Sequence, residues 1–173
     1  MSLLQAFKQI RCFVFDVDGV LTDSTIWLLE DGQQVRRMNI KDGYALQLAI
    51  KKGYQILVLS GGNAPAVKTR LQKLGVTNVF IGVENKLALL KTFLEENNFS
   101  TQQVLYMGDD IPDYECMMAC GLPCCPADAV PEIKQVSRFV AAHKGGEGCA
   151  REVIEKVLRL NQHWLLDTAI ASK

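Results

Sequence analysis

The chain has 173 residues, of which 49% are hydrophobic, and its 19 basic residues balance its 19 acidic ones. Such a length and apolar content are typical of one globular domain, which we expect to span residues 1–173, and they exclude a disordered polymer. The balanced charge argues against nucleic acid or an anionic membrane as a partner. No apolar run is long enough to cross a bilayer, and residues 1–9 lack the apolar core of a signal peptide, so we expect a cytoplasmic protein.

Short apolar runs alternate with longer amphipathic stretches. This rhythm predicts an α/β fold, a three-layer Rossmann-like parallel sheet with right-handed crossovers. Six cysteines are present, four of them between residues 116 and 125, and their spacing favours buried thiols over a zinc site. The predicted strands cover 12–15, 55–59, 78–81, 104–107 and 122–124, and the predicted helices cover 43–52, 64–74, 86–97, 111–119 and a last one from 149.

Residues 24–38 interrupt the rhythm. Two short apolar runs flank an Asp-Gly pair there, which predicts a small β-hairpin flap. Trp27 and Leu29 on so short an excursion favour packing against something, either the active site or another subunit. Residues 164–173 are expected to form a C-terminal tail. The gaps between the predicted elements leave no room for a second, inserted domain.

Two carboxylates, Asp16 and Asp18, follow the first predicted strand. Side chains at positions i and i+2 of an extended segment share a face, so both acids point into one crevice. Close carboxylates repel each other unless a proton or a cation lies between them. A hard divalent ion such as Mg²⁺ fits this need and suits a phosphate substrate.

Three further polar elements follow predicted strands: Ser60-Gly61, Lys86, and the run from Asp109 to Asp113. The carboxyl ends of parallel strands meet at one edge of a sheet, so all of these residues are expected to converge with Asp16. Each element alone is compatible with a plain loop or helix cap, whereas the four together favour phosphoryl-transfer chemistry.

The convergence suggests a role for each residue. Asp16 ends its strand and is the predicted nucleophile, and Asp18 is the predicted acid and base. The Ser60 hydroxyl, the Gly61 amide and the Lys86 amine suit the phosphate oxygens. Asp109 is expected to bind the metal with Asp16. In the outer shell, Asp113 is expected to orient Lys86 or a metal-bound water, and Asp110 is either a second outer-shell group or a helix N-cap.

These motifs, in this order, resemble those of the haloacid dehalogenase superfamily. The chain is similar to its capless branch, typified by 3-deoxy-D-manno-octulosonate 8-phosphate (Kdo 8-phosphate) phosphatase. The resemblance implies Mg²⁺-dependent hydrolysis of Kdo 8-phosphate through an aspartyl-phosphate. It also implies a homotetramer in which a neighbour's hairpin lines the site and the tail closes over it. The matching stretches are 16–23, 39–44, Arg70, 85–87, 108–110 and 145–152.

The resemblance also implies further site residues. The Asp18 carbonyl is expected as a third metal ligand, and Asp18 and Lys86 are expected to contact the substrate. Arg70 is carried over as a cation that contacts the substrate. The stretch that contacts the sugar acid contributes Asn39, Lys41, Asp42 and Gly43.

Two positions depart from the family pattern: Gly62 stands where an arginine is often found, and Glu147 lies in a glycine loop that often carries Arg or Lys. Both departures leave open a related substrate, Kdn 9-phosphate or N-acylneuraminate 9-phosphate. A non-catalytic, phosphate-binding regulatory module is the alternative of a different class. The presence of Asp18 argues against it, because such a module has no leaving group to protonate.

Overall fold

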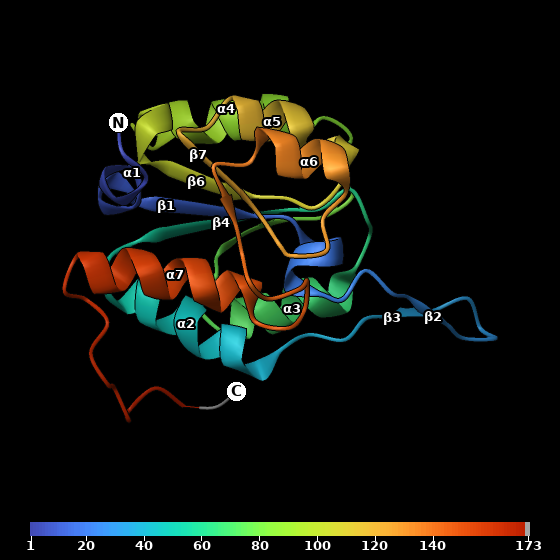
Figure 1. The fold of residues 1–173 in the computed structure, drawn as a ribbon. Coiled ribbons are helices and arrows are strands. Elements are labelled where there is room, and N and C mark those ends of the chain that lie inside the picture. Colours follow the sequence, from blue (N-terminus) through green and yellow to red (C-terminus); the bar gives the residue numbers. More distant parts are fainter. Residues whose placement is uncertain (172–173) are drawn as a thin grey trace.

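A computed structural model describes residues 1–171. Its centre is one six-stranded, all-parallel sheet with the strand order β5-β4-β1-β6-β7-β8 (Figure 1). From β1 the chain adds β4 and β5 on one side of the sheet and then crosses to add β6, β7 and β8 on the other side. The topological switch point therefore lies between β1 and β6. The strands are β1 (Cys12–Phe15), β4 (Gln55–Leu59), β5 (Asn78–Phe80), β6 (Val104–Met107), β7 (Leu122–Cys125) and β8 (Phe139–Val140).

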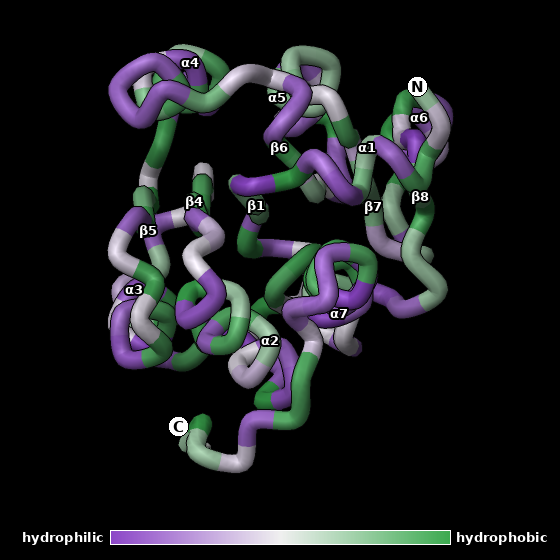
Figure 2. Tube along the Cα trace, turned by 90° about the vertical axis from the view of Figure 1, so that its left-hand side faces the viewer, coloured by the Kyte–Doolittle hydropathy of each residue, from purple (hydrophilic) through white to green (hydrophobic). Residues whose placement is uncertain are grey.

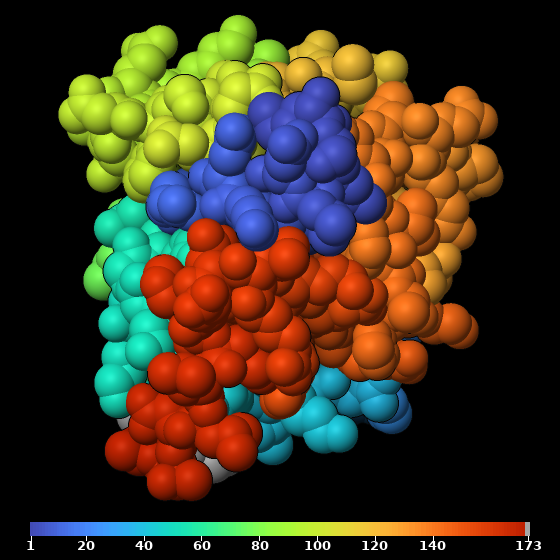
Figure 3. All heavy atoms as spheres, turned by 60° about the vertical axis from the view of Figure 1, so that its left-hand side comes forward, coloured from blue at the N-terminus to red at the C-terminus, as the bar shows by residue number. Residues whose placement is uncertain are grey.

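Helices cover both faces of the sheet, which confirms the predicted three-layer architecture (Figures 1 and 2). One layer holds α2, α3 and α7, and the opposite layer holds α4, α5 and α6. Helix α1 packs beside α7, where Figure 3 shows the two helices in contact on the surface. The helices are α1 (Leu3–Gln9), α2 (Ile40–Lys51), α3 (Pro65–Lys73), α4 (Lys86–Glu96), α5 (Tyr114–Met118), α6 (Pro131–Val136) and α7 (Cys149–Leu160).

The side chains of β1 explain why both faces are covered. Phe13 and Phe15 enter the core beneath α2 and α7, while Cys12 and Val14 enter the core beneath α4 and α5. Side chains alternate along a strand, so a strand that is apolar at every position needs two apolar layers. The six cysteine side chains are all buried.

Several element boundaries differ from the predictions. Helix α2 begins at Ile40 because the Asn39 side chain accepts a hydrogen bond from the amide of Lys41. The predicted helix over 111–119 divides into a 3₁₀ turn, Ile111–Asp113, and α5. Helices α1 and α6 and strand β8 were not predicted, since they are only 7, 6 and 2 residues long.

The hairpin is present but has less regular structure than predicted. It contains β2 (Trp27–Leu28) and β3 (Gln34–Val35), and it projects away from the body of the protein at the carboxyl edge of the sheet (Figure 1). The side chains of Trp27 and Leu28 are 70% and 76% exposed. The hairpin therefore presents a large apolar surface with little packing of its own.

The described part of the predicted tail packs on its own chain. Trp164 makes an edge contact with the ring of Tyr44 in α2, and Asp167 forms an ion pair with Lys51 at the other end of that helix. Residues 172–173 of the predicted tail lie outside the described residues. Among residues 1–171, no helix has both the length and the apolar composition needed to cross a bilayer.

Candidate active site

The loop that follows β1 is a tight turn closed by Thr22. The Thr22 hydroxyl donates to the carbonyl of Val17 and accepts from the amide of Gly19. Gly19 has a φ of +90°, a conformation that side-chain-bearing residues rarely adopt. The turn thereby places Asp16 and Asp18 at the mouth of the crevice that the sheet topology predicts.

A cavity of about 300 Å³ lies at this switch point, where β1, β4 and β6 end; we call it the catalytic cavity. It brings together all four motif elements that the sequence predicted to converge. Eight of the eleven residues that line it have polar or charged side chains, as a phosphate site requires. The lining residues are Asp16, Asp18, Ser24, Ser60, Gly61, Gly62, Lys86, Asp109, Asp110, Pro112 and Asp113.

Lys86 bridges two carboxylates in this cavity. Its Nζ donates to Oδ1 of Asp16 and to Oδ1 of Asp113, each at 2.8 Å, and its side chain is only 9% exposed. The Tyr106 hydroxyl, from the buried face of β6, donates to the same Asp113 oxygen at 2.7 Å. Burial disfavours the charged amine, yet the two carboxylates outweigh it and raise the pKa of Lys86. The amine is therefore a fixed positive charge beside Asp16.

The carboxylate oxygens of Asp16, Asp109 and Asp113 lie within 4.8 Å of one another. Burial, followed by the charge of Asp113, raises the pKa of Asp16 to about 7. Burial and the charges of Asp16 and Asp113 raise the pKa of Asp109 to about 8. Hard oxygen donors that repel one another at this separation fit a divalent cation.

The hydrogen bonds divide this trio into two roles. Asp113 uses Oδ1 for Lys86 and Tyr106, and its Oδ2 accepts from the amide of Asp109 at 3.3 Å. Asp113 is thus engaged in orienting its neighbours, as the sequence suggested. Asp16 and Asp109 remain as the carboxylates best suited to hold the cation.

Ser60 and Asp110 line the cavity but are engaged locally. The Ser60 hydroxyl accepts from the amide of Gly62 at 3.1 Å and is 1% exposed as a residue. Oδ1 of Asp110 accepts from the amide of Ile111 at 2.8 Å, at the start of a 3₁₀ turn. Asp110 thus makes the N-cap contact, and because it also lines the cavity its outer-shell role stays a prediction.

Sequence reasoning missed Arg36 and Tyr106. Arg36 directly follows strand β3. Its guanidinium forms an ion pair with Asp18, with Nε 2.6 Å from Oδ1. Nothing in the sequence distinguishes it from its neighbour Arg37, whose side chain is 67% exposed. Tyr106 could have been found, because a tyrosine in the middle of a buried strand needs a partner for its hydroxyl.

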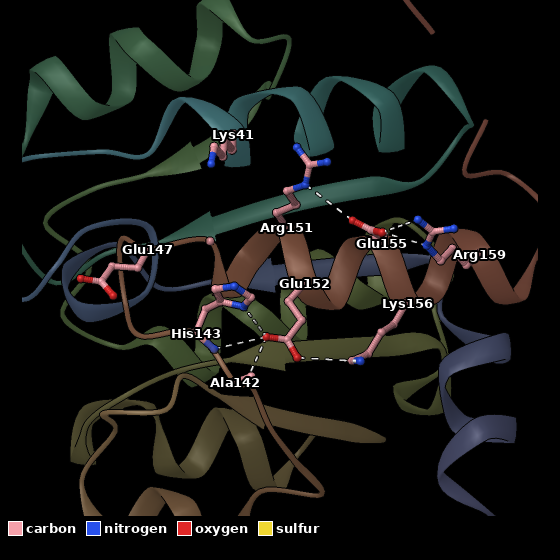
Figure 4. Close-up of a pocket in the computed structure, with 10 residues that line it drawn as sticks. Lys41, Ala142, His143, Glu147, Arg151, Glu152, Glu155, Lys156 and Arg159 are labelled. Carbon is pink, nitrogen blue, oxygen red and sulfur yellow. Dashed lines mark hydrogen bonds and ion pairs between the residues drawn. The ribbon is translucent and has the colours of Figure 1, made fainter. Parts of the chain in front are cut away.

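The predicted sugar-acid contacts lie outside the catalytic cavity of their own chain. The Asn39 side chain caps α2, and Asp42 is buried against the start of α7, where Oδ1 accepts from the amide of Arg151 at 2.8 Å. Lys41 lines a separate cavity of about 700 Å³ along α7, whose other wall includes Arg151 and Glu152 (Figure 4).

A third cavity, of about 1020 Å³, lies between the hairpin and α3; we call it the hairpin cavity. Arg70 and Arg36 line it, and Gly62 lines both this cavity and the catalytic one. A β-carbon on Gly43 would lie 3.6 Å from Nη2 of Arg70. Because Gly62 lines both, the hairpin cavity and the catalytic cavity meet at this residue, where the family pattern often has an arginine.

Comparisons with known proteins agree with this geometry. A family model described as haloacid dehalogenase-like hydrolase matches residues 83–153. The 3-deoxy-D-manno-octulosonate 8-phosphate phosphatase KdsC of Escherichia coli K12 is 33% identical over 151 residues, which cover 87% of this chain and 80% of that protein. The KdsC of Yersinia pestis is 31% identical over 157 residues, covering 91% of this chain and 84% of the relative.

Solved structures show the same similarity. The crystal structure of the Yersinia pestis phosphatase has a TM-score of 0.90 at 30% identity, covering 93% of this chain and 87% of that one. The Moraxella catarrhalis phosphatase, solved in complex with magnesium ion, phosphate ion and KDO, has a TM-score of 0.87 at 27% identity, covering 91% and 90%. The chain therefore belongs to the 3-deoxy-D-manno-octulosonate 8-phosphate phosphatase family of haloacid dehalogenase-like phosphoric monoester hydrolases.

Proposed function

We propose that the protein is a Mg²⁺-dependent phosphatase that hydrolyses Kdo 8-phosphate to Kdo and inorganic phosphate. The observation that carries this proposal is the convergence of Asp16, Lys86 and Asp109 in one cavity at the switch point of the sheet. Family membership supports the substrate, since the relatives in Escherichia coli and Yersinia pestis are Kdo 8-phosphate phosphatases.

The reaction would proceed in two steps. A carboxylate oxygen of Asp16 attacks phosphorus, the bond from phosphorus to the sugar oxygen breaks, and Asp18 gives its proton to that oxygen. Asp18 then takes a proton from a water molecule that attacks the aspartyl-phosphate, which releases phosphate and restores Asp16. The 35% exposed side chain of Asp18 is accessible for both proton transfers.

Other residues of the cavity would hold the phosphate in place. The Lys86 amine lies 2.8 Å from Asp16 and faces the charge that the phosphate brings. The Ser60 hydroxyl and the Gly61 amide would donate to phosphate oxygens. Held by Asp16, Asp109 and the Asp18 carbonyl, Mg²⁺ would supply further positive charge at the phosphate.

The sugar acid would be bound by groups from more than one subunit. We propose a homotetramer in which the hairpin and the tail contribute to neighbouring sites. The highly exposed side chains of Trp27 and Leu28 support this assembly. It would also allow the predicted sugar contacts that lie outside the catalytic cavity of their own chain to serve a neighbour's site. Those contacts are Asn39 and Lys41, with Arg70 in the hairpin cavity. Asp42 and Gly43 are buried within their own chain and would act by holding the start of α2 in place.

A nine-carbon sugar acid is the second candidate substrate. The hairpin cavity of about 1020 Å³ adjoins the catalytic cavity at Gly62, where the Arg36–Asp18 pair lies between the two. That space favours Kdn 9-phosphate or N-acylneuraminate 9-phosphate if the longer chain extends beneath the hairpin. The ratio of kcat/KM for Kdo 8-phosphate and Kdn 9-phosphate, measured by phosphate release, decides between them.

The non-catalytic alternative is tested by removing the nucleophile. Asp16→Asn should lower turnover by more than about 1000-fold while leaving the fold intact. Glu95→Gln is the matched control, because it removes an exposed carboxylate on α4 that does not line the catalytic cavity. Equal activity of wild type and Asp16→Asn would refute the mechanism. Absence of phosphate release in wild type with Mg²⁺ would refute the enzyme assignment.

We also propose a cytoplasmic location. Its support is the burial of all six cysteine side chains, which is typical of thiols kept reduced. Measuring the protein in cytoplasmic and periplasmic or secreted fractions of its host tests this.

A further inference from the structure

Arg36 is a buried cation on an otherwise exposed hairpin. Its side chain is 4% exposed, although Trp27 and Leu28 on the facing strand are 70% and 76% exposed. A long cationic side chain is rarely buried without a charged partner. The chain therefore directs this arginine inward, to a specific contact.

That contact is a bidentate ion pair between the Arg36 guanidinium and the Asp18 carboxylate. Nε of Arg36 donates to Oδ1 at 2.6 Å and Nη2 donates to Oδ2 at 3.2 Å. Such paired hydrogen bonds fix the orientation of a carboxylate as well as attracting it. The Asp18 side chain remains 35% exposed and lines the catalytic cavity, so the ion pair orients the carboxylate and leaves it accessible from the cavity.

Gly62 lies against this ion pair, and its lack of a side chain leaves space for both partners. A β-carbon at position 62 would lie 2.9 Å from Oδ2 of Asp18 and 3.2 Å from Nη2 of Arg36. The φ of Gly62 is not among the positive values of the chain, so its backbone does not demand glycine. A side chain at position 62 would therefore displace the Arg36–Asp18 pair.

We propose that Arg36 is the positioning residue for the acid and base of the reaction. It holds the Asp18 carboxyl group through the shorter contact at Oδ1, so that Oδ2, whose contact is longer, carries the proton to the leaving sugar oxygen. It also links the hairpin to that step. This role rests on the proposed phosphatase mechanism and adds to it a residue from the hairpin.

The leaving group provides the test. A sugar alkoxide needs the proton of Asp18 to depart, whereas p-nitrophenolate departs without one. The ratio kcat/KM reports the steps up to the first irreversible one, here departure of the leaving group. Arg36→Met keeps the buried stem and removes the guanidinium. It should lower kcat/KM for Kdo 8-phosphate by at least about tenfold more than for p-nitrophenyl phosphate.

Companion variants make the test specific. Arg36→Lys should recover part of the loss, since an amine can restore one of the two contacts. Gly62→Ala should show the same preferential loss, because its β-carbon would displace the Asp18 carboxylate. Arg37→Ala, which removes a surface ion pair with Asp23 from the same segment, should leave the ratio between the two substrates unchanged.

The results separate this role from the substrate assignment. Equal losses for both substrates in Arg36→Met, or no loss, would overturn the positioning role. If wild type hydrolyses p-nitrophenyl phosphate but neither Kdo 8-phosphate nor Kdn 9-phosphate, the proposed substrates are wrong. The same comparison is then made with whichever primary alkyl phosphate the wild-type enzyme hydrolyses fastest.

Discussion

Gly19 and Asp109 come from motifs ninety positions apart and touch at the centre of the site: a β-carbon on Gly19 would lie 1.9 Å from Oδ2 of Asp109. The backbone of Gly19 also has a φ of +90°. Glycine therefore meets two demands here, one conformational and one steric. The steric demand bears on function because Asp109 is one of the two carboxylates best suited to hold the cation.

Gly19→Ala is predicted to lose both stability and activity. Gly53→Ala is the matched control, since Gly53 has a φ of +83° but open space around its β-carbon position. The control should lower the free energy of unfolding by about 1–2 kcal/mol and retain activity. Gly19→Ala should lower the free energy of unfolding by more than Gly53→Ala does. It should also weaken Mg²⁺ binding, because the new β-carbon would displace Asp109. Urea unfolding and magnesium titration measure the two effects, and equal behaviour of the variants would contradict the steric argument.

Magnesium is predicted to stabilise the folded protein through Asp109. At a concentration 100 times its Kd, a ligand that binds only the folded state adds about 2.7 kcal/mol to the free energy of unfolding. Thermal unfolding in Mg²⁺ and in EDTA should differ accordingly for wild type and for Glu95→Gln, which removes an exposed carboxylate outside the catalytic cavity. Asp109→Asn should show little difference between the two conditions. A large Mg²⁺ effect that persists in Asp109→Asn would remove Asp109 from the ligand set.

The residues that converge in the catalytic cavity were predictable because each comes after a strand of the sheet. Asp16 follows β1 directly, Asp109 follows β6 after Gly108, and Lys86 begins α4 after the loop that leaves β5. The carboxyl ends of these strands must meet in a parallel sheet. For these three residues, the position next to a predicted strand was enough to place the side chain in the folded protein. The spacing of Asp16 and Asp18 indicated a divalent metal, and family resemblance added the expected sugar-acid substrate, which spacing alone could not supply.

The contacts that the sequence could not reveal involve segments whose position is not determined by a neighbouring strand of the main sheet. Arg36 lies in a hairpin that joins no strand of the main sheet, so its register against Asp18 is not set by alternation. Asp42 sits in the first turn of α2, where a carboxylate is favourable on an exposed helix, and only tertiary packing buries it beneath α7. Short elements such as α6 and β8 carry too few residues for a periodic signal.

Asp42 gives a pH-dependent prediction away from the catalytic cavity. Burial raises the pKa of its carboxyl group from the ordinary 3.8 to about 6, although the amide of Arg151 donates to Oδ1. Oδ2 has no hydrogen-bond partner among the described residues. The folded state thus binds the Asp42 proton more tightly than the unfolded state does. The free energy of unfolding should therefore fall as the pH rises through 6.

Asp42→Asn isolates this effect. Between pH 5 and pH 8, wild type should lose about 1.4 kcal/mol more of its free energy of unfolding than Asp42→Asn loses. Asp23→Asn is the control, because a hydrogen bond from Thr25 lowers the pKa of Asp23 and its titration falls below this window. Urea unfolding in EDTA at several pH values measures all three proteins, and parallel curves for wild type and Asp42→Asn would contradict the assignment.

The hairpin is predicted to hold subunits together. Burying a leucine or a similar side chain stabilises a contact by about 1.5–3 kcal/mol, so Trp27 and Leu28 together are worth about 3–6 kcal/mol per hairpin. The double variant Trp27→Ser/Leu28→Ser should therefore dissociate at concentrations where wild type is tetrameric. Light scattering after size-exclusion chromatography gives the mass of each species.

Met118→Ser controls for the loss of any exposed apolar side chain, since Met118 is 59% exposed on α5, away from the hairpin. It should keep the wild-type mass. If a neighbour's hairpin lines the site, the hairpin variant should also regain activity as protein concentration is raised, because reassociation would rebuild the site by mass action. A hairpin variant that keeps the wild-type mass, or a wild type that is monomeric at micromolar concentration, would exclude assembly through this surface.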